Sequence, residues 1–235
     1  MPSFVFGIIA PMREFALEQK IKPLHTALVI IDIQRDFCAP DGVLARRGRD
    51  VSGVDAVVDR ILSLIELAKG QSIWTIYTQQ IYDREQLNAR QLEQYDVDGK
   101  LVTCDIATTG FQFYRLDPPA ECVYQKYNYN IFSNSRLLTD LDDHGIKTLV
   151  IAGADTAYCV ETAIRNGFDL GYKIVVAEDL LIGIKQLIEF LAHHQHGATG
   201  IAQRQDGSAN LRRSTHVHAP RGLLVYLLGL EFNIT

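Results

Sequence analysis

A cysteine lies shortly after an apolar run in the stretch IAGADTAYCVET, residues 151–162. Thr156 is a suitable N-cap, which places Cys159 in the first turn of the helix predicted to follow. The amide groups and the positive dipole end of such a turn favour a thiolate, the nucleophilic form of cysteine. Most cysteines are small buried hydrophobes, so this position alone leaves both interpretations open.

Two more residues have the chemistry to act on such a thiol. Asp32 ends an apolar run, where a carboxylate is costly unless it has a partner or a task. Lys126 follows another short apolar run and has aromatic neighbours. A strand-end ion pair would explain Asp32, and a lysine stem lying on tyrosine would explain Lys126. Beside Cys159, however, the carboxylate can accept the thiol proton and the ammonium can stabilise the thiolate.

Alternating strands and helices must bring these three residues together. The predicted strands are 26–34, 72–79, 147–153 and 172–179, and the predicted helices are 54–70, 135–145, 156–171 and 184–194. This alternation predicts an α/β fold, a three-layer α/β/α sandwich with a mostly parallel doubly wound sheet. Ligands of such sheets bind beyond the carboxyl ends of the strands, where Asp32, residues 153–156 and Glu178–Asp179 are expected. Residues 82–125 are predicted to form loops and a short strand over that site.

Composition sets the broad class of the protein. The 235 residues are 47% hydrophobic and 22% charged, with a net charge of −5 and no block of lysine and arginine. We therefore expect a globular protein with no nucleic-acid partner. The longest apolar run falls short of the roughly 20 residues that span a bilayer, and the N-terminus lacks a signal-peptide pattern. These features predict a cytoplasmic location with no membrane partner.

Three stretches give the sequence its resemblance to a known family. They are ALVIIDIQRDFC (27–38), QKYNYNIFSNSRL (125–137) and LVIAGADTAYCVETAIRNGFDLGYKIVVAEDL (149–180). Together they resemble the isochorismatase-like cysteine hydrolases over roughly residues 24–200. That family includes nicotinamidases, N-carbamoylsarcosine amidase, ureidoacrylate hydrolases and isochorismatases.

The resemblance implies a role for each chemical residue. Asp32 would be the general base, Lys126 its electrostatic partner and Cys159 the nucleophile. A cis peptide bond between Ala154 and Asp155 is also implied. The backbone N–H groups of Asp155 and Cys159 would then form an oxyanion hole.

Other predictions concern the surroundings of this set. Gln34, Phe37 and Tyr158 flank the catalytic candidates and could bind substrate, although core packing would also explain them. Cys38, Cys104 and Cys122 are predicted to be structural thiols. No cofactor is implied, and no metal site is expected, because the histidines of the family's metal motif are absent after the second strand. The histidines at 192–196 and 216–218 are read as solvated.

Three functions follow, in order of preference. The first is a cysteine-dependent hydrolase that cleaves the C–N bond of a small amide, urea or carbamoyl compound through a thioester. The second is vinyl-ether hydrolysis of isochorismate, which needs an acid such as Asp32 but no thiol. The third is a binding protein that kept the fold, an alternative left open because Gln79 or Gln80 stands where many relatives have an arginine.

The same family resemblance predicts the domain organisation. Residues 1–203 are predicted to form a single hydrolase domain, with residues 1–23 as an N-terminal extension. Residues 204–235 are predicted to be an atypical tail, since they match nothing in the family. The resemblance also implies a homo-oligomer, either a dimer or a tetramer.

Overall fold

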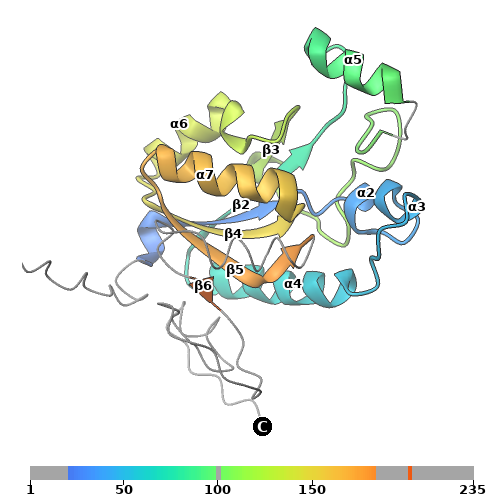
Figure 1. The fold of residues 1–235 in the computed structure, drawn as a ribbon. Helices are drawn as coiled ribbons and strands as arrows, with labels where there is room; N and C mark the ends of the chain where they lie inside the picture. Colours follow the sequence, from blue (N-terminus) through green and yellow to red (C-terminus); the bar gives the residue numbers. More distant parts are fainter. Residues whose placement is uncertain (1–20, 99–101, 184–200, 203–235) are drawn as a thin grey trace, which may run out of the picture.

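A parallel β-sheet organises the chain (Figure 1). The computed structural model describes residues 21–98, 102–183 and 201–202. In this part of the chain a six-stranded sheet has the order β3-β2-β1-β4-β5-β6, and all neighbouring strands run parallel. The strands are β1 (Thr26–Ile31), β2 (Trp74–Gln80), β3 (Val123–Lys126), β4 (Thr148–Ala154), β5 (Lys173–Ile182) and β6 (Ile201–Ala202). The predicted α/β fold is confirmed.

Helices cover both faces of this sheet. The helices are α2 (Arg35–Cys38), α3 (Val43–Arg46), α4 (Val54–Gly70), α5 (Ala89–Asp98), α6 (Ser135–Asp143) and α7 (Glu161–Asp169). Shorter turns are η1 (Pro23–His25), η2 (Ala120–Cys122), η3 (Ile131–Ser133) and η4 (Thr156–Val160). Helix α4 lies on one face, and α6 and α7 lie on the other (Figure 1). The result is a three-layer arrangement.

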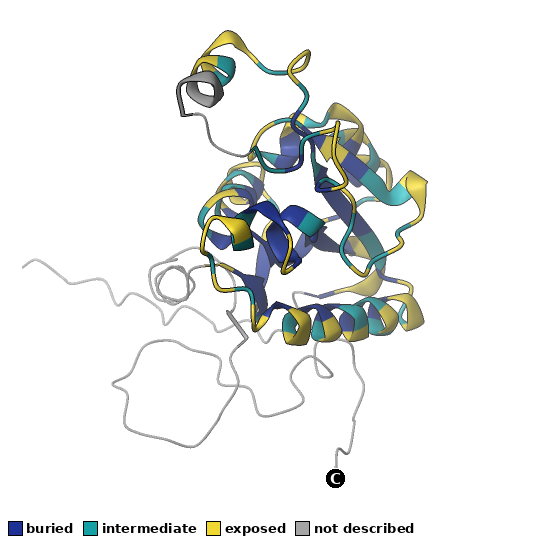
Figure 2. Ribbon diagram, turned by 90° about the vertical axis from the view of Figure 1, so that its right-hand side faces the viewer, coloured by how far each residue is buried: buried dark blue, intermediate teal, exposed yellow. Residues whose placement is uncertain are grey.

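Two apolar cores separate the layers, because each strand sends alternate side chains to opposite faces. One core packs Val58, Ile61 and Leu64 of α4 against the sheet. The other packs residues of α6 and α7 against the opposite face, and it includes Cys159. Figure 2 shows the buried strands between partly exposed helices. The thiol therefore belongs to the α6–α7 side of the sheet.

The carboxyl ends of the central strands meet where Asp32 lies. Ile31 pairs with Thr78 of β2 on one side and with Gly153 of β4 on the other. Asp32 has a φ of 49°, so the chain leaves the extended conformation there and β1 ends earlier than predicted. Gly153 has a φ of +125°, and a Cβ on it would come within 2.1 Å of the Ile31 carbonyl oxygen. Only glycine allows this close approach of β4 to β1.

Three predictions need correction. Glu178 and Asp179 are not at a strand end, because β5 continues to Ile182 after a register shift against β4. The region predicted as loops and one strand also contains α5, which stands away from the rest of the molecule (Figure 1). The short helices α2 and α3 were not predicted either, because four-residue helices leave almost no apolar period in the sequence.

Several predictions fall on residues outside the described ranges. These are the helix at 184–194, the histidines at 192–196 and 216–218, and the tail at 204–235. The proposed domain limits remain a prediction.

Candidate active site

Asp32, Lys126 and Cys159 come together from three strand ends. Lys126 Nζ lies 2.7 Å from Asp32 Oδ2 and 3.2 Å from Cys159 Sγ. The two charged side chains are at most 1% exposed, and Cys159 is 4% exposed. A buried charge of this kind persists only when it is paired, and here the carboxylate and the ammonium pair with each other. The structure thus contains an enclosed acid, base and thiol cluster.

The three ammonium protons of Lys126 have defined acceptors. Nζ donates to Gln80 Oε1 at 2.8 Å, to the Asn128 carbonyl at 3.2 Å and to Cys159 Sγ. Asp32 Oδ2 also lies 2.7 Å from this ammonium, and a carboxylate oxygen has two lone pairs. A lone pair on this oxygen therefore remains available for a proton.

The other carboxylate oxygen of Asp32 is held in place. Thr78 Oγ1 donates to Oδ1 at 2.7 Å, and Thr78 is itself buried on β2. Thr78 thus holds one oxygen of the carboxylate in place, and the other oxygen faces Lys126. This orientation suits a general base.

The pKa of the Cys159 thiol is raised above its ordinary value. Burial is the main cause, the negative charge of Asp32 adds to it, and Lys126 opposes it. Burial alone would lower the pKa of Lys126, but Asp32 and Cys159 raise it overall. This corrects the expectation of a resting thiolate: the Lys126 charge is already balanced by Asp32, so the thiol stays protonated until a base removes its proton.

A single π-helical turn, η4, carries the cysteine at the end of β4. Its N-cap is Asp155, whose Oδ1 accepts from the Ala157 N–H at 3.1 Å. Thr156 was predicted to be the cap, but its hydroxyl donates to the Ile182 carbonyl on β5 at 3.0 Å. The Ala154–Asp155 bond is cis. The oxyanion hole at the Asp155 and Cys159 N–H groups remains a prediction.

The three predicted lining residues differ in their surroundings. Gln34 is fully buried, and its amide donates to the Gln80 carbonyl and accepts from the Gln80 N–H, each at 2.8 Å. Phe37 belongs to the core on the α4 side. Tyr158 is 49% exposed, and its ring centroid lies 5.3 Å from that of Tyr129. Substrate contact by these residues remains a prediction, and Tyr158 is the only one of the three that reaches solvent.

Thr78 and Gln80 are the residues that sequence reasoning missed. Both side chains contact the charged pair, and both lie in the last three residues of β2. Alternation along a strand places residues 78 and 80 on the same face. That spacing, at the carboxyl end of a predicted strand, was the signal that could have found them.

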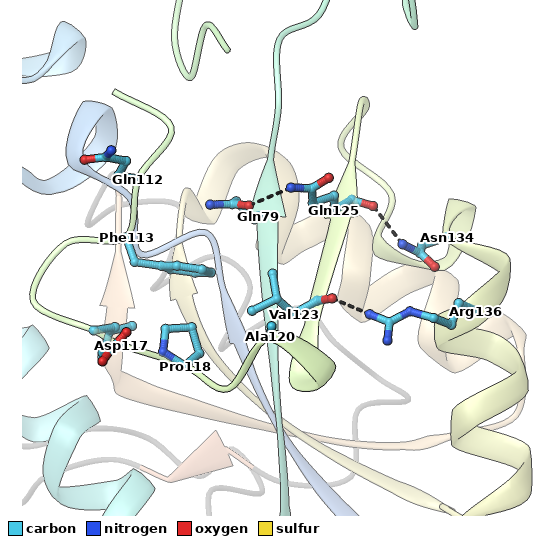
Figure 3. Close-up of a pocket in the computed structure, with 11 residues that line it drawn as sticks. Gln79, Gln112, Phe113, Asp117, Pro118, Ala120, Val123, Gln125, Asn134 and Arg136 are labelled. Carbon is cyan, nitrogen blue, oxygen red and sulfur yellow. Dashed lines mark hydrogen bonds between the residues drawn. The ribbon is translucent and has the colours of Figure 1, made fainter. Parts of the chain in front are cut away.

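A surface pocket of about 630 Å³ is lined in part by residues of strands β2 and β3 (Figure 3). Its lining includes Gln79, Phe113, Val123, Gln125 and Arg136, and it contains none of the three clustered residues. Gln79 and Gln125 alternate with Gln80 and Lys126 along the strands, so they face the α4 side of the sheet. The pocket is separate from the thiol.

Comparison with known proteins defines the family. The model of the isochorismatase domain matches residues 26–203. The chain belongs to the isochorismatase family. Within the family, it is 29% identical over 174 residues to ureidoacrylate amidohydrolase RutB of Azorhizobium caulinodans, a match that covers 66% of this chain and 75% of the relative.

Solved structures of the family share the fold. A cysteine hydrolase from Pseudomonas syringae pv. phaseolicola 1448A superposes with a TM-score of 0.61 at 27% identity, over 70% of this chain and 76% of the other. An isochorismatase family protein from Desulfovibrio vulgaris superposes with a TM-score of 0.63 at 22% identity, over 75% and 93% of the two chains. The second likeness concerns the fold alone.

The helices and the possible metal ligands of the described residues are the remaining features that bear on function. Within those residues, every helix is too short or too polar to cross a bilayer. No group of three or more histidine, cysteine or acidic side chains in the described part of the chain is arranged to hold a metal ion.

Proposed function

We propose that Cys159, Asp32 and Lys126 hydrolyse a small amide, urea or carbamoyl compound through a thioester. The chain is a cysteine hydrolase of the isochorismatase family that acts on carbon–nitrogen bonds other than peptide bonds. The residue roles and the substrate class are the parts proposed here. Because relatives of this chain are ureidoacrylate amidohydrolases, a ureido carboxylic acid, which is a carboxylic acid with an N-carbamoylated amino group, is the first compound to test.

The proposed reaction begins with proton transfer. Asp32 Oδ2 takes the thiol proton while the Cys159 sulfur attacks the carbonyl carbon. The carbonyl oxygen becomes an oxyanion, which the N–H groups of Asp155 and Cys159 stabilise. The tetrahedral intermediate collapses as Asp32 returns the proton to the departing nitrogen, and ammonia or an amine leaves.

The second half of the proposed reaction regenerates the enzyme. Asp32 removes a proton from water, and the resulting hydroxide attacks the thioester. The C–S bond then breaks, and the thiolate recovers its proton from Asp32. Lys126 keeps an ammonium N–H directed at the sulfur throughout, so it stabilises the thiolate each time it forms.

One observation carries the proposal: the buried Asp32 carboxylate and the Cys159 thiol, whose pKa is raised, meet at the same Lys126 ammonium. The raised pKa keeps the thiol protonated at rest, and the Asp32 carboxylate is the neighbouring group that can accept its proton. This arrangement also favours C–N cleavage over vinyl-ether hydrolysis, which uses no thiol.

Replacement of the sulfur tests the proposal. Cys159→Ala is expected to turn over a ureido carboxylic acid at least about 10³-fold more slowly, because no covalent intermediate can form. Cys122→Ala, which changes a half-buried thiol, is the matched control and should retain turnover. Full activity of Cys159→Ala would exclude covalent catalysis. Pyruvate release from isochorismate by this variant would instead support the vinyl-ether reaction.

Location and assembly are also proposed. The four cysteines are free thiols in the described residues, which agrees with a reducing compartment, and we propose the cytoplasm. We further propose a dimer or tetramer, to be tested by light scattering on the full chain.

A further inference from the structure

An arginine outside the catalytic cluster is tied to the turn that carries the nucleophile. Arg49 Nη1 donates to Oδ2 of Asp155, although the two residues are 106 positions apart. The Asp155 side chain is 7% exposed and that of Arg49 is 27% exposed. An ion pair this sheltered is screened much less than a surface pair.

The backbone of Arg49 is fixed by the end of α3. The Arg49 N–H donates to the Leu44 carbonyl at 3.0 Å, and the Gly48 N–H donates to the Ala45 carbonyl at 2.9 Å. Gly48 has a φ of +87°, so these bonds form a Schellman cap with glycine in the left-handed position. The cap thus fixes the backbone from which the Arg49 side chain extends.

Both oxygens of the Asp155 carboxylate are used. Oδ1 accepts from the Ala157 N–H, and Oδ2 pairs with Arg49. The first contact ties the carboxylate to its own turn, and the second ties that turn to α3. Together they restrict how residue 155 can rotate at the start of η4.

We propose that Arg49 is a positioning residue for the oxyanion hole. By holding the Asp155 side chain, it keeps the Asp155 N–H directed at the place where the carbonyl oxygen becomes negative. Misplacement of such a donor removes stabilisation of the oxyanion, whose charge is present in the transition state and absent in the ground state. This inference rests on the proposed function, because it assumes the oxyanion hole at Asp155 and Cys159.

Substitution of Arg49 gives a direct test. Arg49→Met keeps the aliphatic stem but removes the charge, and it is expected to lower kcat about tenfold or more with less than about a threefold change in KM. Arg49→Lys restores a cation to Asp155 and should recover part of kcat. Arg115→Met is the matched control, since Arg115 also pairs with carboxylates, Asp55 and Asp59, but on α4.

A double-mutant cycle shows whether Arg49 acts through Asp155. Asp155→Asn preserves an acceptor for the Ala157 N–H but removes the partner charge. The double variant should be no slower than the worse single variant, because both changes break the same contact. Losses that multiply would overturn the proposal.

Three other results would also overturn it. The first is an unchanged kcat in Arg49→Met, and the second is a higher KM with an unchanged kcat. The third is a lower kcat accompanied by a lower melting temperature and by slower alkylation of Cys159. A loss confined to KM, and only for substrates with a carboxylate, would make Arg49 a substrate-binding residue instead. Failure of the proposed function is distinguishable, because Cys159→Ala would then remain active.

Discussion

The two faces of strands β2 and β3 surround their side chains differently. On one face, Thr78, Gln80 and Lys126 converge on a buried ion pair and a thiol. On the other face, Gln79 and Gln125 line an open pocket and hydrogen bond to each other at 3.1 Å (Figure 3). The residues alternate along the same strands, so one residue of register separates the two environments.

The comparison teaches that an open pocket need not coincide with the candidate reactive site. Hydrogen bonds with backbone carbonyls hold polar groups of the pocket: the Gln79 amide donates to the Phe111 carbonyl, the Asn134 amide donates to the Gln125 carbonyl, and the Arg136 guanidinium donates to the Val123 carbonyl. In the enclosed cluster, the Asp32 carboxylate pairs with the Lys126 ammonium, and burial raises the pKa of the neighbouring thiol. A buried ion pair beside a thiol of raised pKa, rather than volume, is what makes this face the candidate site.

The largest expected effect comes from removal of the Asp32 charge. Asp32→Asn should lower turnover by about 10³-fold, within the range for a general base. Its effect on the thiol has the opposite direction. Because Asp32 raises the pKa of Cys159 and Lys126 lowers it, the variant should hold more thiolate at pH 7 and react faster with iodoacetamide.

Peptide mass spectrometry of the alkylated protein measures this reaction at Cys159 itself. Lys126→Met is the opposing control, since loss of the cation should raise the pKa of the thiol further and slow its alkylation. If Asp32→Asn turned over substrate normally, or if its thiol reacted more slowly than that of the parent, the difference between the two faces would not depend on the Asp32 charge.

A smaller effect separates the neighbouring glutamines. Gln80→Leu removes an acceptor of the Lys126 ammonium, and a hydrogen bond to a charged group contributes at least about 1.5 kcal/mol, so turnover should fall roughly tenfold or more if that contribution is lost in the transition state. Gln79→Leu changes the pocket face and should leave turnover within about twofold. Steady-state kinetics of the pair measure the contrast, and thermal unfolding reveals any loss of stability. Equal losses of turnover would remove the distinction between the faces.

The smallest expected effect concerns alkaline stability. Above about pH 9 the unfolded Cys159 thiol ionises while the folded thiol, with its raised pKa, stays protonated. The folded state then binds more protons, so the free energy of unfolding falls as pH rises, by at most about 1.4 kcal/mol per pH unit for this group. In urea unfolding from pH 8 to 10, the free energy of unfolding should therefore fall less steeply with pH for Cys159→Ala than for the parent protein. Identical slopes would mean that the thiol ionises equally in both states.

Much of the fold was predictable because its signals are local. Helix 54–70 was predicted with the bounds that the structure has, since a 17-residue apolar period ends at a glycine. The end of β1 was predicted three residues too late, because the left-handed turn at Asp32 leaves no mark in a run of apolar letters. The N-cap was assigned to Thr156 rather than Asp155 for a similar reason. Both residue types cap helices, and only the bond from Thr156 to β5 distinguishes them.

The sequence by itself determined the sheet, its layers and the three residue types whose chemistry suits one another, because apolar periodicity and strand ends are written in neighbouring residues. Tertiary structure alone decided that the thiol is held protonated, that Gln80 and Thr78 hold the charged pair, and that Arg49 reaches Asp155. These properties depend on burial and on distances between residues far apart in the chain. A pKa or an ion pair is set by what surrounds a group in space, and spacing along the chain does not contain that information.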